Sequence, residues 1–284
     1  MKDSVKITLA LLPIILLIIL FFIYPIIITF DRSLDDINGN YIGFERYGAL
    51  FANPEFTDAF WYTVQISVIS TVISSILAIV IAFALRESFI GKKITLFLYQ
   101  TNISLPHIAM GAMVLMLLSQ TGLISSIAYH LGFIETWSEF PKFVEGYSPF
   151  GVIISYTLKF TPFIGMAVLA ILVSFARDYE DQSATLGIGK IRTIFHITLP
   201  AIKPAIYSTA MIVFCFAFGS YDVPTLLGRS ETLSMMAYNA YNSTYNPAAR
   251  YDGYAISMVI AAITLTITAI YLYISFSAKK EVKR

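Results

Sequence analysis

Apolar residues run through this 284-residue chain in long blocks that short polar segments separate. A hydrocarbon core about 30 Å thick needs roughly 20 consecutive apolar residues for one helical crossing, and several blocks reach that length. Six spans are predicted, near residues 7–30, 60–85, 94–118, 150–174, 206–227 and 254–276. The alternating segments of a transmembrane β-barrel are missing from the sequence. The pattern predicts an all-α polytopic membrane protein with a single transmembrane domain over residues 1–284.

Basic residues are distributed unequally between the connecting segments. Thirteen of the 19 Lys and Arg residues lie on the side of the two termini, five lie on the other side, and Lys159 lies within a span. Cytoplasmic segments carry the excess of Lys and Arg in membrane proteins. Both termini are therefore predicted to be cytoplasmic. The basic C-terminal tail would flank the membrane as an anchor, and it consists of Lys279, Lys280, Lys283 and Arg284.

Composition agrees with this picture and excludes several functions. Only 13% of the residues are charged, against about 25% in soluble domains, and the mean hydropathy is +0.73. The net charge of +1 gives no nucleic-acid surface. The single cysteine, Cys215, excludes an intrachain disulfide, and three scattered histidines predict no metal site. We expect contacts with membrane lipid and no cofactor on this chain.

Two further features modify the simple six-span pattern. Residues 122–137 carry apolar side chains at helical spacing but are too short to cross, so a short amphipathic helix should lie along the outer interface. Pro106, Pro162 and Pro224 fall inside predicted spans, where they bend helices and free backbone carbonyls. Bends that serve packing and bends that line a pathway are both consistent with this pattern.

The segment from Asp178 to Ala205 lies between the fourth and fifth spans and is long for a simple turn. Residues 177–186 predict a helix that ends at Gly187, because glycine readily adopts the left-handed conformation. A second short helix over residues 188–198 should stop at Pro200. Its predicted apolar face holds Ile191, Ile194, Phe195 and Thr198. The two helices would form a docking knob.

This segment resembles the EAA loop of binding-protein-dependent importer permeases. That pattern is E-A-A, three residues, glycine, nine residues and I-x-L-P, and here Gly187 is followed at the same spacing by Ile197, Leu199 and Pro200. The triplet departs from the pattern, since it reads Asp181, Gln182 and Ser183 and keeps only the acidic first position. Chance spacing in an ordinary loop is the alternative interpretation.

The resemblance implies a function and partners. It implies the MetI-like permease fold in a bacterial inner membrane, with residues 175–205 as a coupling loop that inserts into an ATPase subunit. Asp181, Gln182, Ser183 and Gly187 would form that contact. It also implies an ATPase dimer that binds ATP and Mg, a second permease, expected to be a related chain, and an extracytoplasmic solute-binding protein.

Other segments extend the resemblance over most of the chain. They are LLPIILLIILFFIYPIIITFDRSL, YGALFANPEFTDAFWYTVQIS and FGSYDVPTLLG. These segments are most similar to the spermidine/putrescine, ferric-ion and phosphonate permeases. A polyamine-like cation is therefore the expected solute, with phosphonate, ferric ion or another small solute as alternatives.

Lys159 and Asp222 are the two ionisable residues placed well inside predicted spans. Charges there are costly and face protein or water. They would either form an ion pair between spans four and five or line the translocation path. Tyr156, Phe160 and Tyr221 would supply aromatic walls for such a path, although aromatic residues in spans often serve packing.

No catalytic residues are predicted. The chain has no G-x-x-x-x-G-K-S/T loop, so ATP hydrolysis is expected on a separate subunit, and neither H-E-x-x-H nor G-x-S-x-G occurs. A channel or secondary carrier is compatible with hydropathy alone. The loop at residues 178–205 favours the ATP-driven importer, because a carrier needs no ATPase-docking knob.

Overall fold

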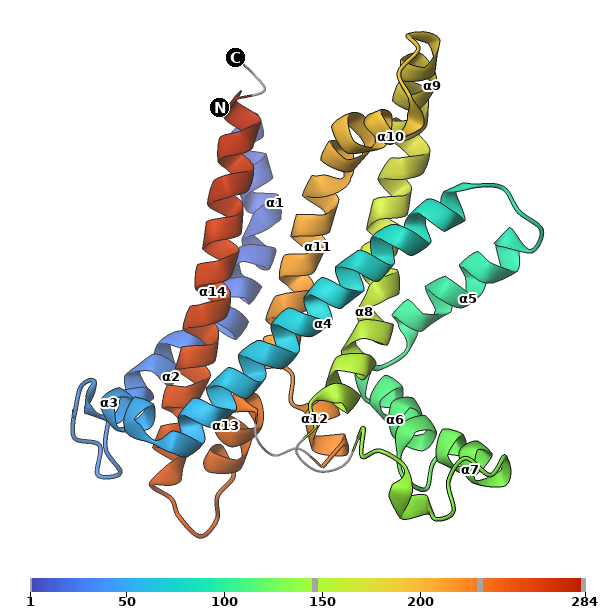
Figure 1. Cartoon of the computed structure of the whole chain (residues 1–284). Helices are drawn as coiled ribbons and strands as arrows, with labels where there is room; N and C mark the ends of the chain where they lie inside the picture. The colour runs from blue at the N-terminus through green and yellow to red at the C-terminus, as the bar shows by residue number, and fades with distance from the viewer. Residues whose placement is uncertain (1, 145–147, 229–231, 282–284) are drawn as a thin grey trace. The chain divides into compact units, whose positions relative to one another are not determined.

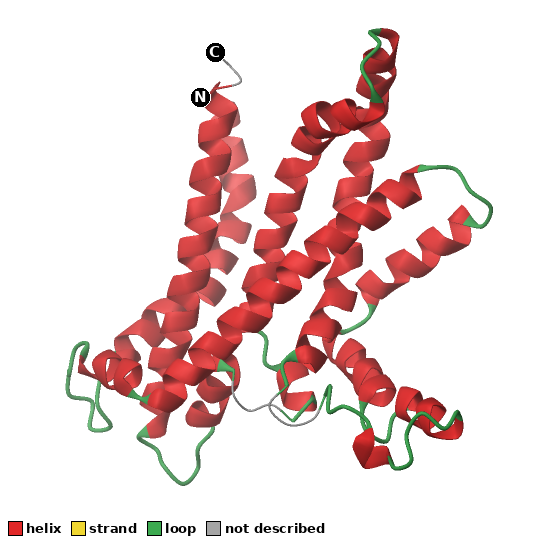
Figure 2. Ribbon diagram, viewed as in Figure 1, coloured by secondary structure: helices red, strands yellow, loops and turns green. Residues whose placement is uncertain are grey.

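The computed structural model describes residues 2–144, 148–228 and 232–281, and helices make up most of these ranges (Figures 1 and 2). Within them no β-strand forms beyond one isolated bridge between Asp35 and Tyr41. Three basic residues counted in the sequence, Arg229, Lys283 and Arg284, lie outside the described residues. The all-α prediction is confirmed.

Six helical segments of the described residues are long and apolar enough to cross a membrane, which confirms the predicted number. They are Thr8–Ser33, Pro54–Arg86, His107–His130, Phe150–Ser174, Lys190–Gly219 and Ala249–Ser275. The first has none of its apolar window buried inside the chain, as expected for a helix that lipid or a partner covers. The cytoplasmic placement of the termini stays a prediction.

The helices fall into two compact units. One comprises residues 1–60 and 233–263, and the other comprises residues 61–232 and 264–284. Two long helices, α4 (Pro54–Arg86) and α14 (Ala249–Glu281), contribute to both. The first unit also contains α1 (Lys2–Ile18), a π-helical turn (Ile19–Ile23), α2 (Tyr24–Ser33), α3 (Glu45–Ala52) and α13 (Leu233–Tyr241).

Arg46, on α3, organises the polar part of the first unit. Its guanidinium donates to the Asp252 carboxylate at 2.6 Å and to the Asp35 carbonyl at 2.8 Å. The same group lies 5.5 Å from the centre of the Tyr251 ring. These contacts fix the loop that follows α2 against the beginning of α14.

The second unit is built around α8 (Phe150–Ile171), which packs against α5 (Lys92–Ser104), α6 (His107–Leu118) and α11 (Leu199–Gly219). Its remaining elements are α7 (Leu123–His130), a 3-10 turn (Trp137–Glu139), π-helical turns (Leu172–Ala176 and Ile194–Thr198), α9 (Arg177–Thr185), α10 (Lys190–Thr193) and α12 (Asp222–Leu226). The membrane-length window of α8 is 56% buried, the largest share of the six, so α8 is the core helix of this unit.

The predicted third span over residues 94–118 is wrong as a continuous helix. The backbone at Leu105 is extended, with φ −69° and ψ 139°, and α6 begins only after Pro106. Proline disfavours the helical conformation of the residue before it and has no N–H to bond the preceding turn. The membrane-length segment at this position is instead His107–His130, which includes α6 and α7.

The fifth span also differs from its predicted bounds of 206–227. One helical segment runs from Lys190 to Gly219, and the chain then bends into the separate short helix α12. Pro200 does not end the second loop helix as predicted. A π-helical turn at Ile194–Thr198 precedes it, and such a turn accommodates a local break in the ordinary helical hydrogen-bond pattern.

The short amphipathic helix predicted within residues 122–137 corresponds to α7. Ser125 is buried, whereas Leu123, Ile124 and Ile127 are exposed on the described surface. An exposed apolar face of this length fits an interfacial helix, and its position at a membrane surface stays a prediction.

Candidate functional site

The loop between α9 and α10 has a defined geometry. Gly187 has φ +73°, the left-handed conformation that the sequence predicts for the end of the first loop helix. The Gly187 N–H donates to the Ala184 carbonyl and the Ile188 N–H donates to the Ser183 carbonyl, each at 3.0 Å. This pair of bonds is the Schellman motif, which satisfies the terminal carbonyls of α9. The turn is therefore a fixed part of the loop.

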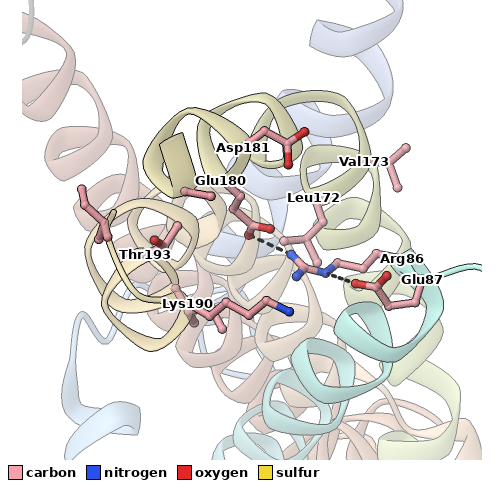
Figure 3. A pocket seen from close by; sticks show the side chains of 11 residues that line it. Arg86, Glu87, Leu172, Val173, Glu180, Asp181, Lys190 and Thr193 are labelled. Carbon is pink, nitrogen blue, oxygen red and sulfur yellow. Dashed lines mark hydrogen bonds and ion pairs between the residues drawn. The ribbon is translucent and has the colours of Figure 1, made fainter. Parts of the chain in front are cut away.

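Glu180 connects this loop to two other helices. Its Oε1 atom accepts hydrogen bonds from Arg86 Nη1 at 2.8 Å and from Thr198 Oγ1 at 2.6 Å. Arg86 ends α4, and Thr198 is fully buried where α11 begins. Figure 3 shows the Arg86 guanidinium between Glu180 and Glu87. One carboxylate thus fixes α9 to the ends of α4 and α11.

The charge state of Glu180 reflects these contacts. Burial raises the pKa of the Glu180 carboxyl, but the hydrogen bonds from Arg86 and Thr198 and the positive charges of Arg86 and Lys190 outweigh burial. The net result is a pKa below the ordinary glutamate value. Glu180 is therefore ionised at neutral pH and forms charge-assisted hydrogen bonds, which are stronger than neutral ones.

A pocket of about 270 Å³ lies beside this network. Arg86 and Glu180 line it together with Asp181 and Lys190, which Figure 3 shows as sticks around the opening. Charges of both signs border the pocket, so it has no clear preference for a cation or an anion. We assign it no ligand.

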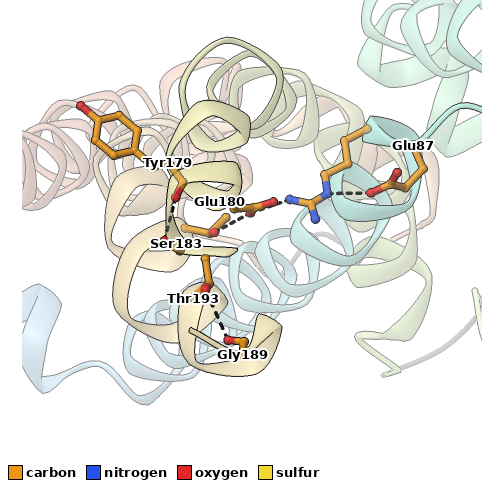
Figure 4. Close-up of polar contacts among 8 residues, drawn as sticks. Glu87, Tyr179, Glu180, Ser183, Gly189 and Thr193 are labelled. Carbon is orange, nitrogen blue, oxygen red and sulfur yellow. Dashed lines mark hydrogen bonds and ion pairs between the residues drawn. The ribbon is translucent and has the colours of Figure 1, made fainter. Parts of the chain in front are cut away.

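The predicted coupling residues occupy different environments. Asp181 and Gln182 are exposed, whereas Ser183 is buried and its hydroxyl donates to the Tyr179 carbonyl at 2.7 Å (Figure 4). Ile197 is partly buried, Leu199 packs against the core, and Pro200 is exposed. The triplet therefore presents two side chains outward and uses the third to stabilise α9.

The apolar surface of the loop is exposed, although its composition differs from the prediction. Leu186, Ile191 and Phe195 are 78%, 75% and 62% exposed. Thr198 is buried and Ile194 is partly buried, so neither belongs to that surface. We call Leu186, Ile191 and Phe195 the apolar tip.

Lys159 lies on α8 and is only 6% exposed. Its ammonium group donates to the carbonyl oxygens of Asn102 and Ile103, both at 2.9 Å, and of Leu105 at 2.5 Å. A lysine ammonium has three N–H donors, so this arrangement uses all of them. Among the described residues, the ion pairs do not include Lys159 with Asp222. The ion-pair interpretation is not supported in this conformation.

Asp222 lies outside any long helix, at the first position of α12, and its carboxylate accepts a hydrogen bond from the Ser220 hydroxyl. Tyr221 precedes it and is exposed. Tyr156 and Phe160 are buried on α8, with ring centres 5.8 Å apart. Tyr156 and Phe160 therefore lie next to each other. Lys159 instead donates to the backbone carbonyls at the end of α5.

Sequence reasoning missed several residues at these positions. The sequence singles out neither Glu180 nor Arg86, although Glu180 adjoins the predicted triplet, and it places Thr198 on the apolar face instead of at the Glu180 carboxylate. Its partner Arg86 lies 94 residues away in sequence, and no local pattern links the two. His107, one of the three scattered histidines, has a packing role, since it stacks on Phe216 with ring centres 4.0 Å apart and also contacts Phe160.

Solved structures share this fold. A bacterial ABC transporter involved in the import of the acidic polysaccharide alginate aligns with a TM-score of 0.76 at 21% identity, over 97% of this chain and 96% of that chain. The bacterial alginate ABC transporter in complex with alginate pentasaccharide-bound periplasmic protein gives a TM-score of 0.77 at 21% identity, over 96% and 95%. At this identity the likeness supports the fold alone.

Sequence relatives align over nearly the full length. The sulfoquinovosyl glycerol transport system permease protein SmoG of Agrobacterium fabrum is 25% identical, over 96% of this chain and 91% of the relative. The sn-glycerol-3-phosphate transport system permease protein UgpA of Pectobacterium atrosepticum is 26% identical, over 91% and 90%. The trehalose/maltose transport system permease protein MalF of Thermococcus litoralis is 26% identical, over 93% and 91%.

Six of the described helical segments are long and apolar enough to cross a membrane, and together with the family match below they make the chain a multi-pass inner membrane protein. The chain belongs to the family of binding-protein-dependent transport system inner membrane components, whose model matches residues 50–280. It is a permease subunit of an ABC importer, and the sequence-based prediction of this class is confirmed. The alternatives of a channel or secondary carrier are set aside.

Proposed function

We propose that the α9–α10 loop is the surface through which this permease contacts its ATPase subunit. The observation that carries the proposal is the apolar tip, Leu186, Ile191 and Phe195, exposed on a loop that the Schellman turn and Glu180 hold rigid. Exposed apolar side chains on a hydrogen-bonded loop favour a protein contact. Asp181, Gln182 and Gly187 lie in the same loop and would adjoin the contact.

The apolar tip and Glu180 would have different roles in coupling. The apolar tip would bind the ATPase, and Glu180 would pass its displacement to α4 and α11 through Arg86 and Thr198. The distances of 2.8 and 2.6 Å indicate direct contact without an intervening water. ATP and Mg would bind only to the partner subunit.

Reconstitution tests this proposal. Proteoliposomes with the permeases, the ATPase subunit and the solute-binding protein should take up solute and hydrolyse ATP, whereas the same proteoliposomes without the ATPase should do neither. Phe195→Glu should prevent co-purification of the ATPase, because it places a charge in an apolar contact. The matched control, Phe133→Glu, changes another exposed phenylalanine outside the loop and should retain the ATPase. Equal retention in both variants would contradict the proposed contact.

We propose further that the solute is a sugar or a glycerol derivative such as a polyol phosphate. Support comes from relatives whose transport systems carry sulfoquinovosyl glycerol, sn-glycerol-3-phosphate and trehalose or maltose. These relatives give no support to the polyamine-like cation expected from the sequence. Hydroxyl-rich solutes require hydrogen-bonding groups and aromatic surfaces, and the exposed Tyr221 would supply both. Tyr156 and Phe160 are buried in this conformation, so they would contact a solute only in another state of the transport cycle.

The assembly would also contain a solute-binding protein and a second permease. The family description names a binding-protein-dependent system, which supports the first partner. The expectation of a related second permease chain is retained as part of this proposal. Uptake assays with radiolabelled disaccharide, glycerol-3-phosphate and spermidine in the full complex distinguish the solute classes. Uptake of spermidine with no uptake of the disaccharide or of glycerol-3-phosphate would overturn the proposal of a sugar or glycerol-derived solute.

A further inference from the structure

The break between α5 and α6 creates a set of carbonyl oxygens that need a positive partner. Helix α5 ends at Ser104, and the terminal turn of a helix leaves its last carbonyl groups without the usual N–H donor four residues later. The Asn102 carbonyl accepts only the Leu105 N–H at 3.3 Å, so one of its two acceptor positions remains open. Pro106 has no N–H, so it cannot satisfy them by continuing the helix. These groups also lie at the negative end of the α5 dipole. The carbonyls of Asn102, Ile103 and Leu105 form what we call the carbonyl cradle.

One nitrogen atom fills the carbonyl cradle. The Lys159 ammonium lies 2.5 to 2.9 Å from all three oxygens. Three oxygens around a single positive centre are the arrangement that also binds a free ammonium ion, whose N–H groups match those of a lysine. The cradle therefore carries the features of a small-cation site, with the cation supplied by the chain itself.

We propose that the carbonyl cradle is a binding site for a monovalent cation of the ammonium type, which Lys159 occupies from within the chain. Through this site Lys159 acts as a positioning residue for α6 and α12. All three of its N–H groups are engaged, so it offers none to a passing solute in this conformation. The carbonyl cradle and Lys159 belong to this chain, so their interaction does not depend on the identity of the solute.

The residues that follow the break show what the filled cradle positions. His107 begins α6 and stacks on Phe216 of α11 at 4.0 Å between ring centres. One turn later, Gly111 lies so close to α12 that an added Cβ atom would come within 3.2 Å of Leu226 and 3.3 Å of Val223. Helix α12 begins with Asp222, a candidate path residue. Loss of the Lys159 ammonium between α5 and α6 would loosen both the stacking of His107 on Phe216 and the packing of Gly111 against α12.

Chemical rescue tests the site. Lys159→Ala should lower the thermal unfolding midpoint of the purified importer complex, because it empties the cradle. Ammonium chloride should then raise the midpoint of this variant by about 3 °C or more over choline chloride at equal ionic strength, by mass action on the folded state. The wild-type complex should respond equally to both salts, since its cradle is filled.

A matched variant separates charge from volume. Lys159→Met fills a similar volume with no charge and no donor, so it should be destabilised like Lys159→Ala and show no response specific to ammonium. Wild-type stability in Lys159→Met, or identical ammonium and choline responses in Lys159→Ala, would overturn the proposal. If Lys159→Ala does not survive purification in choline, the yields of folded complex from membranes solubilised in ammonium and in choline are compared, and equal yields would likewise overturn it.

Discussion

Asn102 and Lys159 satisfy backbone carbonyls on each other's helices. The Lys159 ammonium donates to the Asn102 carbonyl at 2.9 Å, while the Asn102 side-chain amide donates to the Leu158 carbonyl at 3.2 Å. The Leu158 carbonyl has no helical N–H donor, because the residue four positions later in α8 is Pro162. Pro106 likewise removes the N–H donor four residues after Asn102, so each helix supplies a donor to a carbonyl that a proline leaves without its helical partner.

This exchange predicts a dependence between Asn102 and Pro162. Asn102→Ala removes the donor to the Leu158 carbonyl and should lower the free energy of unfolding by about 1 kcal/mol. Pro162→Ala restores a backbone N–H that can bond to the same carbonyl. In the Pro162→Ala background, Asn102→Ala should therefore lower the free energy of unfolding by less than it does in the wild-type background. Denaturation of the four proteins measures this coupling, and identical costs in both backgrounds would contradict the exchange.

Sequence reasoning recovered the features that local patterns determine. The number of spans followed from hydropathy, and the end of α9 followed from the glycine at 187, because a left-handed turn needs that residue. The break at Leu105 was foreseeable from Pro106 as a bend. The complete end of helix α5 at this point was not foreseeable. Whether proline bends or ends a helix depends on the hydrogen-bond donors near its free carbonyls, and here the donor is Lys159 on another helix.

The partners of buried charges could not be predicted from the sequence. The sequence suggests Lys159 and Asp222 either as an ion pair or as path residues, because they are the two ionisable groups inside predicted spans. The sequence does not show that backbone carbonyls would compete for the ammonium, since every residue carries a carbonyl and only a helix break exposes it. Glu180 was missed for a related reason, because its partner Arg86 is adjacent only after α4 and α9 have packed.

Glu180 should contribute to stability in a pH-dependent manner. Its pKa is lowered in the folded chain, so its contribution is fully present above the ordinary glutamate value near 4.5 and is lost as pH falls through the lowered pKa. Glu180→Gln should lower the free energy of unfolding at pH 7 by about 1.5–3 kcal/mol, the range for hydrogen bonds to charged groups. The difference from wild type should shrink below pH 4.5.

Glu87→Gln is the matched control for this measurement. Glu87 also pairs with Arg86, at 3.2 Å, but its side chain is 70% exposed. An exposed ion pair contributes little, so this substitution should change stability by less than about 1 kcal/mol. Thermal unfolding of the three proteins from pH 7 to pH 3 gives both comparisons. Equal effects of the two substitutions would remove the special role of Glu180.

Gly187→Leu should uncouple transport from ATP hydrolysis while the chain still inserts in the membrane. No atom lies within 4 Å of a Cβ built on Gly187, so the substitution causes no direct clash. The cost comes from the backbone, because φ +73° is unfavourable for a side chain with a Cβ by about 1–2 kcal/mol. The backbone at residue 187 would relieve this cost by leaving the left-handed conformation, and that change would reorient the apolar tip.

Gly187→Asn provides the control, because asparagine tolerates the left-handed conformation better than other residues with a side chain. It should retain coupling that Gly187→Leu loses. The measurement is the number of ATP molecules hydrolysed per solute transported in proteoliposomes of the full complex. A normal ratio in Gly187→Leu would remove this turn from the coupling mechanism.

Charge reversal at Lys159 and Asp222 gives the sharpest test of how the two residues are partnered. Lys159→Asp places a carboxylate against three carbonyl oxygens, and repulsion should destabilise the break between α5 and α6. Asp222→Lys removes the acceptor for the Ser220 hydroxyl. Because the two residues form no ion pair among the described residues and bond to different partners, the losses in uptake and in unfolding midpoint should add in the double variant. Asp222→Asn, which keeps an acceptor oxygen, should lose less than Asp222→Lys. Recovery of uptake in the double variant would instead mean that the two residues pair in another conformation of the transport cycle.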